Sequence, residues 1–503
     1  MWWFKDIELD SISGLSINRA YDSILTNLGN GKQVIVALID MPLDIEHEDL
    51  QQNIWVNPDE TPNNQIDDDN NGYVDDINGW NFISSRDGKT AKFVNYEYTR
   101  ILKKYSDSFK NNTIQDSILH HTIVNANKKY KERLKYAEKD TAFINVEERD
   151  KKIAAKTLSK FFKGNNYSIK DLDSLKKLHT NDSLLKLHIE WMKHFINYKY
   201  TDEYFAMYKL KAKERFNKLL NVNYNDRTII GDNSDDINDK DYGSPIIGAE
   251  SGFFDHSTKM AGFIAARRDN AIGIEGVSDN IKIMPICISA FGDEHDKDIA
   301  LAIRYAVDNG AKVVNMSYGK EFSLYKEWVF DAIKYAEEKD VLIIKSAGNN
   351  RKNIKDIEVY PNDNDYQSSD EITDNFLMVG ATSYNANKKL IPIFSNYGAI
   401  QVDVFAPGHK VYSTVVSIKK YDFSNGGTST SCALTSGVAA LIRSYYPKLT
   451  ASQVKHILMD SGLEYTFNVK VGDTLLSFNA LSKSGKVVNA YNALIMADSF
   501  SKN

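Results

Sequence analysis

Residues 281–316, IKIMPICISAFGDEHDKDIALAIRYAVDNGAKVVNM, decide the fold class of this chain. Ile281–Ile288 and Lys312–Met316 are short apolar runs rich in β-branched residues, and Asp298–Asn309 between them repeats apolar residues at helical spacing. Apolar runs that are continuous rather than alternating are typical of parallel strands covered on both faces. The stretch therefore predicts a strand–helix–strand unit with two parallel strands.

The same rhythm continues on both sides of this stretch. A second helical pattern covers Lys326–Lys339, and further strands are predicted at Val34–Ile39, Val341–Ile344, Phe376–Val379 and Val402–Phe405. We therefore expect an α/β fold with a doubly wound, mostly parallel sheet flanked by helices. Catalytic and binding residues of such sheets lie at the carboxyl ends of the strands, so we expect the chemistry there.

The middle of the chain has a different composition. From about residue 90 to residue 225 it has no proline and a single glycine, Gly164, and it is dense in Lys, Glu, Tyr and Leu. Stretches such as Ser183–Tyr198 and Thr201–Leu220 repeat apolar residues at helical spacing. These patterns predict a discontinuous α/β domain, residues 1–84 and 243–503, interrupted by a large α-helical insertion, residues 85–242.

Composition excludes several classes of protein. The chain has 503 residues and a formal net charge of −6, which argues against a nucleic-acid-binding protein. Its two cysteines, Cys287 and Cys432, are too few for a disulfide scaffold or a thiolate zinc site. It has no apolar run of the roughly 18 residues that a transmembrane helix needs. Met1–Asp6 does not resemble a secretory signal, so we expect a cytoplasmic protein, or a secreted or periplasmic one if a signal has been removed.

Three residues at predicted strand and helix ends form a candidate catalytic set. Asp40 follows the apolar run Val34–Ile39, and a buried carboxylate there needs a hydrogen-bonding partner. His256 lies in the first turn of a predicted helix of small residues. Ser429 follows two glycines at a predicted helix N-terminus, where backbone N–H groups favour a developing negative charge. Taken singly, each is equally consistent with a turn, a cap or an ordinary core residue.

A fourth candidate, Asn349, follows the predicted strand Val341–Ile344. Its side-chain amide is able to donate a hydrogen bond, and the alternative is an asparagine that merely forms a turn.

Together, these residues and their surroundings resemble the subtilase family of serine peptidases, in which Asp, His and Ser occur in this chain order. The resemblance includes the stretches NAIGIEGVS at 270–278, VVNMSYG at 313–319, FSNYG at 394–398 and VFAPG at 404–408. It covers about residues 31–82 and 243–495 and leaves the helical middle outside. The chain is closest in appearance to family members from Bacteroidetes that carry an insertion at the same place.

Two motifs depart from the family pattern. Beside His256, Ser257 replaces a glycine and Lys259 a second histidine, and the proline expected after the serine motif is absent from Thr430–Ala433. No triad atom is lost, but both changes touch the first turn of a catalytic helix and so bear on substrate fit and rate. A lysine close to the imidazole would lower the pKa of the histidine.

The resemblance implies a serine endopeptidase that hydrolyses peptide bonds through an acyl-enzyme. His256 would take the proton of Ser429 and Asp40 would orient the imidazole. Asn349 and the backbone N–H of Ser429 would stabilise the oxyanion. An extended polypeptide substrate is expected to pair as an added strand with the residues that line the cleft, which are Ser317, Tyr318, Gly319, Ala347 and Gly348. We expect a monomer without a nucleic-acid partner.

Two kinds of function stay open at this point. The chain is either an active endopeptidase, engaged in general degradation or in the processing of a dedicated precursor, or a catalytically weak, peptide-binding pseudopeptidase. Only the altered motif flanks favour the second. An esterase of the α/β-hydrolase type is disfavoured, because no Gly-x-Ser-x-Gly motif surrounds Ser429 and the chain order of the triad would differ.

The acidic stretch DDDNNGYVDD, residues 67–76, predicts a metal site. It alternates oxygen ligands around a glycine and matches the first half of a calcium loop, without the terminal glutamate. We expect a structural Ca²⁺ here, and the alternative is a solvated acidic turn. The expected ligands are Asp67, Asp69, Asn71, the carbonyl group of Tyr73, and Asp75 or Asp76. A second acidic stretch, Asp232–Asp241, is a weaker candidate.

Overall fold

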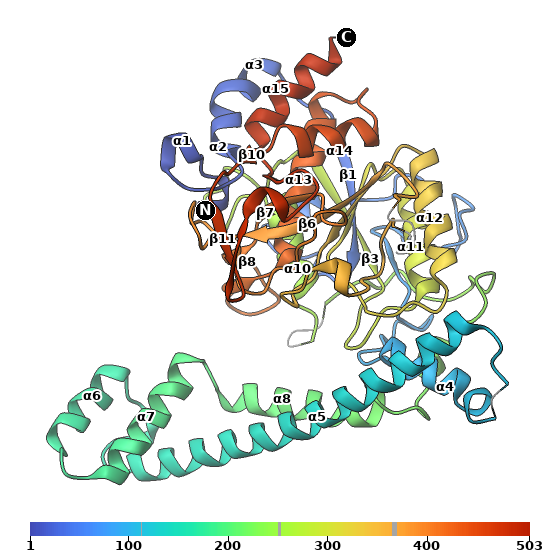
Figure 1. Ribbon diagram of the computed structural model, residues 1–503. Helices are drawn as coiled ribbons and strands as arrows, with labels where there is room; N and C mark the ends of the chain where they lie inside the picture. Colours follow the sequence, from blue (N-terminus) through green and yellow to red (C-terminus); the bar gives the residue numbers. More distant parts are fainter. Residues whose placement is uncertain (112, 250–252, 365–369, 503) are drawn as a thin grey trace. The chain divides into compact units, whose positions relative to one another are not determined.

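A nine-stranded sheet organises most of the chain in the computed structural model, which describes residues 1–111, 113–249, 253–364 and 370–502 (Figure 1). The strand order is β10-β13-β7-β6-β5-β4-β1-β3-β2, and among the neighbouring pairs only β10 and β13 are antiparallel. The predicted doubly wound, mostly parallel α/β fold is thereby confirmed. The strands are β1 (Val34–Asp40), β2 (Trp80–Asn81), β3 (Ile281–Cys287), β4 (Val313–Met316), β5 (Leu342–Ser346), β6 (Phe376–Thr382), β7 (Val404–Pro407), β10 (Leu463–Glu464) and β13 (Lys486–Val487).

The direction of the strand order changes at β1. Strand β3 pairs with one edge of β1 and β4 with the other, and β5, β6 and β7 follow outward from β4 in chain order. In sheets of this kind a crevice forms where the order reverses, outside the carboxyl ends of the strands. Asp40 is the last residue of β1 and lies at this point.

Helices cover both faces of the sheet (Figure 1). Side chains alternate along β1, so that Val36 and Leu38 pack in a core with α10 and α13, whereas Ala37 and Ile39 pack in a second core with α11 and α12. Burial on both faces is the physical reason for the continuous apolar runs in the sequence. The helices of this unit are α10 (His256–Ala265), α11 (Asp296–Asp308), α12 (Lys326–Glu338), α13 (Thr428–Tyr445), α14 (Ala451–Asp460) and α15 (Ala490–Ser501).

Shorter elements complete this part of the chain. They are the helices α1 (Ile7–Asp10), α2 (Ile17–Ala20), α3 (Thr26–Leu28) and α9 (Arg227–Ile230), and the hairpins of β8 (His409–Thr414) with β9 (Tyr421–Gly426) and of β11 (Asn468–Val471) with β12 (Thr474–Ser477). Within the described ranges, no helix combines the length and the apolar character that crossing a lipid bilayer requires.

The chain divides into two compact units, which are the sheet unit, residues 1–97 and 226–503, and the helical unit, residues 98–225. In the helical unit, α6 and α7 pack at one end of the long helix α5, in a small core that includes Leu158, Leu175, Ile189 and Phe195 (Figure 1). Its helices are α4 (Glu97–Lys110), α5 (Ser117–Leu158), α6 (Ile169–Leu178), α7 (Ser183–Asn197) and α8 (Asp202–Glu214).

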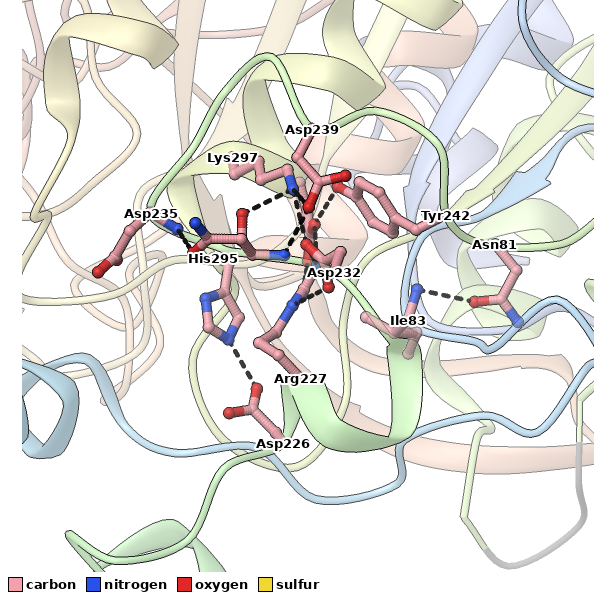
Figure 2. Close-up of polar contacts among 12 residues, drawn as sticks. Asn81, Ile83, Asp226, Arg227, Asp232, Asp235, Asp239, Tyr242, His295 and Lys297 are labelled. Carbon is pink, nitrogen blue, oxygen red and sulfur yellow. Dashed lines mark hydrogen bonds and ion pairs between the residues drawn. The ribbon is translucent and has the colours of Figure 1, made fainter.

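The helical unit is shorter than the predicted insertion, because residues 85–97 and 226–242 belong to the sheet unit. Figure 2 shows the buried ion pairs that hold the second of these flanks. The Arg227 guanidinium contacts Asp298 at 2.7 Å and Asp232 at 2.5 Å, and Lys297 Nζ lies 2.7 Å from Asp232. All four side chains are at most 4% exposed. These contacts therefore hold Arg227 and Asp232 against α11, where the chain re-enters the sheet unit.

Buried ion pairs also hold the first flank. Lys320 Nζ contacts Glu97 at 3.2 Å and Asp296 at 2.7 Å, and each of these side chains is at most 2% exposed. Glu97 is the first residue of α4, so the sheet unit holds the chain at the residue where it enters the helical unit.

Candidate active site

The fold brings Asp40 and His256 together from positions 216 residues apart. His256 is the first residue of α10, and its Nδ1 lies 2.9 Å from both carboxylate oxygens of Asp40. Asp40 is 2% exposed and also accepts the backbone N–H of Met41. A proton on Nδ1 that is shared with this carboxylate leaves Nε2 as the basic nitrogen of the ring.

Burial and three charges set the pKa of His256. Burial lowers this pKa, whereas the charge of Asp40 and its hydrogen bond raise it. Lys259 lowers the pKa and Asp255 raises it, and these two side chains form an ion pair with each other. The net result is a pKa above the ordinary value for histidine. Lys259 thus lowers the pKa of His256, as expected from the sequence, but the effect of Asp40 outweighs it.

Ser429 is the second residue of α13, and Gly427, two residues before it, caps this helix. Its hydroxyl donates to the carbonyl oxygen of Ser317 at 2.8 Å, and the Ser317 hydroxyl donates to the Ser429 carbonyl at 3.2 Å. In this conformation no hydrogen bond joins Ser429 to His256 within the described part of the chain. The hydroxyl therefore rests against the segment that follows β4.

Asn349 is exposed and lies beside the start of α13. Its Oδ1 accepts the backbone N–H of Thr428 at 2.9 Å and the Thr428 hydroxyl at 3.2 Å. Because a backbone N–H only donates, these contacts orient the amide and leave Nδ2 available to a ligand. Thr428, which sequence reasoning did not assign a role, thus orients Asn349 beside Ser429.

The residues predicted to line the cleft come from two adjacent strand ends. Ser317, Tyr318 and Gly319 follow β4, and Ala347 and Gly348 follow β5, its parallel neighbour. Tyr318 is half-buried and its hydroxyl donates to the Met316 sulfur, whereas Gly319 is exposed. The Gly348 N–H donates to the Thr428 hydroxyl at 3.0 Å. The two segments thus flank the start of α13, where Ser429 lies.

The departures from the family pattern are accommodated by hydrogen bonds. The buried Ser257 hydroxyl donates to the Pro42 carbonyl at 2.6 Å, which connects α10 to the segment after β1. The Cys432 thiol lies 3.1 Å from both Asn315 Oδ1 in β4 and the Ile344 carbonyl oxygen in β5, and so connects α13 to the sheet. Helix α13 runs without interruption through Ala433.

A model of the subtilase family matches residues 31–480. The chain belongs to the subtilase family. A thermophilic serine proteinase from Bacillus sp. (strain AK1) is 31% identical over 241 residues, which are 48% of this subtilase and 52% of that protein. Subtilisin DY from Bacillus licheniformis is 31% identical over 230 residues, 45% of this chain and 77% of that protein. This subtilase thus spans about half the length of the first of these relatives.

Among solved structures, a protease from Pseudoalteromonas arctica PAMC 21717 matches with 27% identity and a TM-score of 0.39, over 48% of this chain and 70% of that chain. The relatives that the comparisons identify at about 30% identity are proteases, in agreement with the family assignment.

Outside the candidate active site, this subtilase has an acidic cluster that could hold a metal ion. It consists of Glu60, Asp67 and Asp69, whose carboxylate oxygens lie within 4.8 Å of one another. Glu60 precedes the predicted loop and joins the cluster because its Oε1 accepts the backbone N–H groups of Asp68 and Asp69. Its Oε2 is buried without a hydrogen-bond partner. Burial raises the pKa of this carboxyl group above its ordinary value, and the neighbouring carboxylates of Asp69 and Asp68 also raise it.

The other residues of the predicted metal loop lie differently. Asn71 directs its amide nitrogen toward Asp69 and Asp76, and its Oδ1 accepts the Tyr73 N–H. Asp75 accepts the backbone N–H groups of residues 64 and 65, apart from the cluster. Asp76 is buried and accepts the Tyr305 hydroxyl at 2.5 Å, and burial raises its pKa to about 6. The structure thus gathers Asp67 and Asp69 with Glu60 rather than with Asp75.

The second acidic stretch has counter-ions of its own. Asp232 pairs with Arg227 and Lys297, and Asp239 lies 3.8 Å from Lys297 (Figure 2). Because Arg227 and Lys297 already neutralise carboxylates of this stretch, it is a weaker candidate for a metal site than the cluster at Glu60.

Proposed function

We propose that this subtilase is a serine endopeptidase with Asp40, His256 and Ser429 as its catalytic triad and Asn349 as an oxyanion donor. The observation that carries the proposal is the Asp40–His256 contact at the point where the strand order reverses, together with Ser429 at the N-terminus of α13, a helix that packs against α10 and β1. An extended polypeptide is the proposed substrate, paired with the segments that follow β4 and β5.

The proposed reaction begins when the Ser429 hydroxyl leaves the Ser317 carbonyl and turns toward Nε2 of His256. An N–H of an extended substrate would compete for that carbonyl and so release the hydroxyl. Nε2 takes the proton as Oγ bonds to the scissile carbonyl carbon, and the nearby carboxylate of Asp40 stabilises the imidazolium. The imidazolium then gives its proton to the leaving amine as the peptide C–N bond breaks. A water molecule hydrolyses the acyl-enzyme by the same route.

Two donors would stabilise the oxyanion of each tetrahedral intermediate. Asn349 Nδ2 is one, because Thr428 holds the amide with its nitrogen unused. The backbone N–H of Ser429 is the other, because the first N–H groups of a helix have no partner within the helix. Both donors are fixed before the substrate binds.

The same proposal includes a structural Ca²⁺ at Glu60, Asp67 and Asp69. Carboxylate oxygens are the ligands that Ca²⁺ prefers. Over the part of the chain that the structure describes, no lysine or arginine forms an ion pair with these three side chains. The unpartnered Glu60 Oε2 fits a bound cation.

A fluorophosphonate probe tests the catalytic proposal, because it reacts with an activated serine. The purified chain should be labelled, Ser429→Ala should not be labelled, and Ser417→Ala, a change at an exposed serine, should be labelled like the wild type. A folded wild-type chain that resists the probe with and without Ca²⁺ would refute the proposal and favour the peptide-binding pseudopeptidase.

A further inference from the structure

Lys345 is a buried amine that the proposed reaction does not use. It lies near the carboxyl end of β5, two residues before Ala347, and is fully buried. Its Nζ donates one hydrogen bond, to the carbonyl oxygen of Ser346 at 2.7 Å. An ammonium group has three N–H donors, so two of them have no acceptor among the described residues.

The other buried lysines of the described chain have carboxylate partners. Lys297 pairs with Asp232, Lys320 with Glu97 and Asp296, and Lys455 with Glu371. No ion pair of Lys345 occurs in the described ranges. Burial without a counter-ion is costly for an ammonium group, and it lowers the pKa of Lys345 to about 8, although Cys432 and Glu294 raise this pKa. At pH 7 the group is still mainly charged and has no carboxylate in direct contact among the described residues.

The ammonium group lies between the two segments that line the cleft. A Cβ built on Gly319 would be 2.9 Å from Lys345 Nζ and 3.2 Å from the Tyr360 carbonyl oxygen, so the amine closely approaches the backbone of this glycine. Toward the second segment, Nζ donates its hydrogen bond to the carbonyl oxygen of Ser346, the residue before Ala347. In one segment Ser317 contacts Ser429, and in the other Gly348 contacts Thr428. A side chain that enters between the segments therefore approaches Lys345.

The position of the scissile bond decides which substrate residue enters there. The attacked carbonyl group must lie within reach of both Ser429 Oγ and Asn349 Nδ2, and these atoms are flanked by the same two segments. The residue that supplies this carbonyl, here called the acyl residue, is therefore the one whose side chain enters between Gly319 and Ser346.

We propose that Lys345 makes this subtilase select substrates with glutamate or aspartate as the acyl residue. The inference rests on the proposed endopeptidase function. A carboxylate that enters between the segments would accept the unused N–H donors of Lys345 and supply the missing anion. An apolar acyl residue would leave the ammonium group buried without a counter-charge, and a lysine or arginine would be repelled.

Peptide p-nitroanilides that differ only in the acyl residue test this inference. With Glu, Gln, Phe and Lys at that position, kcat/KM for Glu should exceed that for the isosteric Gln by on the order of 10-fold or more. In Lys345→Met, which keeps most of the length of the side chain and removes its charge, the preference for Glu over Gln should disappear and Phe should become the better substrate. The control Lys352→Met, at an exposed lysine of the following loop, should keep the wild-type order.

The outcomes separate this inference from the proposed function. A wild-type enzyme that cleaves Gln or Phe peptides as fast as the Glu peptide would overturn the role of Lys345 while upholding the endopeptidase, and this comparison does not depend on a variant that folds. A Glu preference that survives in Lys345→Met would also overturn it. Failure to cleave any peptide, together with no fluorophosphonate labelling, would overturn both.

Discussion

Replacing Asn349 by leucine removes an amide donor but keeps the bulk of the side chain. As the proposed oxyanion donor, this amide would bind the tetrahedral intermediate more strongly than the ground-state peptide, so kcat should fall while KM changes little. The loss of one such donor costs about 10²–10³-fold in kcat in enzymes of this type. Steady-state kinetics measures the effect, with Asn350→Leu at the exposed neighbouring residue as the control. Similar losses of kcat in both variants would argue against a specific role of Asn349.

The pH profile of kcat/KM tests the environment of His256. This residue acts as a base only when neutral, and its pKa is raised by Asp40. Activity should therefore fall as the pH decreases through a value above that of an ordinary histidine. Asp40→Asn removes the charge that raises the pKa, so the acid limb should move to lower pH, with a loss of about 10⁴-fold in kcat.

The substitution Lys259→Met should move the acid limb of the pH profile in the opposite direction to Asp40→Asn. Lys259 lowers the pKa of His256, so its removal should move the acid limb to higher pH. An acid limb that stays in place in both variants would show that neither charge acts on the catalytic base.

At the residue scale, the structure brings together some of the residues that the motifs predicted and separates others, such as Asp75 from Asp67 and Asp69. The motif order predicted that Asp40 and His256 would meet, and the structure places them in contact. Glu60 had no such signal, because it precedes the acidic run and joins the cluster only through the folding of the loop. Lys345 ends an apolar run, and its missing partner becomes apparent only when the surroundings are known.

At the scale of elements, the buried contact between the 226–242 segment and α11 should contribute strongly to stability. Arg227→Met leaves Asp298, which is 0% exposed, without its cation. Removing one partner of a buried ion pair typically destabilises a protein by about 3–5 kcal/mol. Urea unfolding measures the change in the free energy of unfolding.

A matched control exists for this variant. Arg86 pairs with Asp241 at the surface, where the two side chains are 66% and 89% exposed. Arg86→Met should therefore change the free energy of unfolding by only about 0–1 kcal/mol. Equal effects of the two substitutions would contradict the assignment of the buried contact.

The acidic loop should make thermal stability depend on calcium. Chelation by EGTA is expected to lower the melting temperature of the wild type, because a ligand that binds only the folded state stabilises it. Glu60→Gln should weaken this dependence, whereas Asp75→Asn, a change outside the cluster, should preserve it. Differential scanning calorimetry with and without EGTA makes the comparison. A melting temperature indifferent to EGTA would contradict a calcium site.

Elements were predictable from sequence where a strand is a continuous apolar run or a helix repeats apolar residues at helical spacing. The strands β1, β3 and β5 and the helices α11 and α12 fall within or close to their expected ranges. The edge strands β2, β10 and β13 have two residues each, too short to produce a periodic signal. The insertion was expected at residues 85–242, but the sheet unit includes residues 85–97 and 226–242, where Glu97 and Arg227 form buried ion pairs with it.

For the molecule as a whole, the helical unit offers a test of substrate choice. Deletion of residues 98–225, with a short flexible linker in their place, should leave a folded sheet unit, because each unit has its own core. If the unit selects a dedicated precursor, the deletion should broaden the cleavage of unstructured peptides. Mass spectrometry of a digested peptide mixture measures the cleavage profile. An unchanged profile would exclude this role, and loss of the cooperative melting transition would contradict independent folding.

The ion pairs at the two ends of the helical unit bear on how such a chain diverges among species. Glu97 pairs with Lys320, directly after the cleft residue Gly319, and Arg227 pairs with Asp298. The segment between Glu97 and Arg227 folds as a compact unit of its own. We therefore expect it to vary in length and in number of helices among related chains while the sheet unit is retained. Because Lys320 also pairs with Asp296 and Arg227 with Asp232, we expect natural selection to preserve each of these two charge clusters as a group.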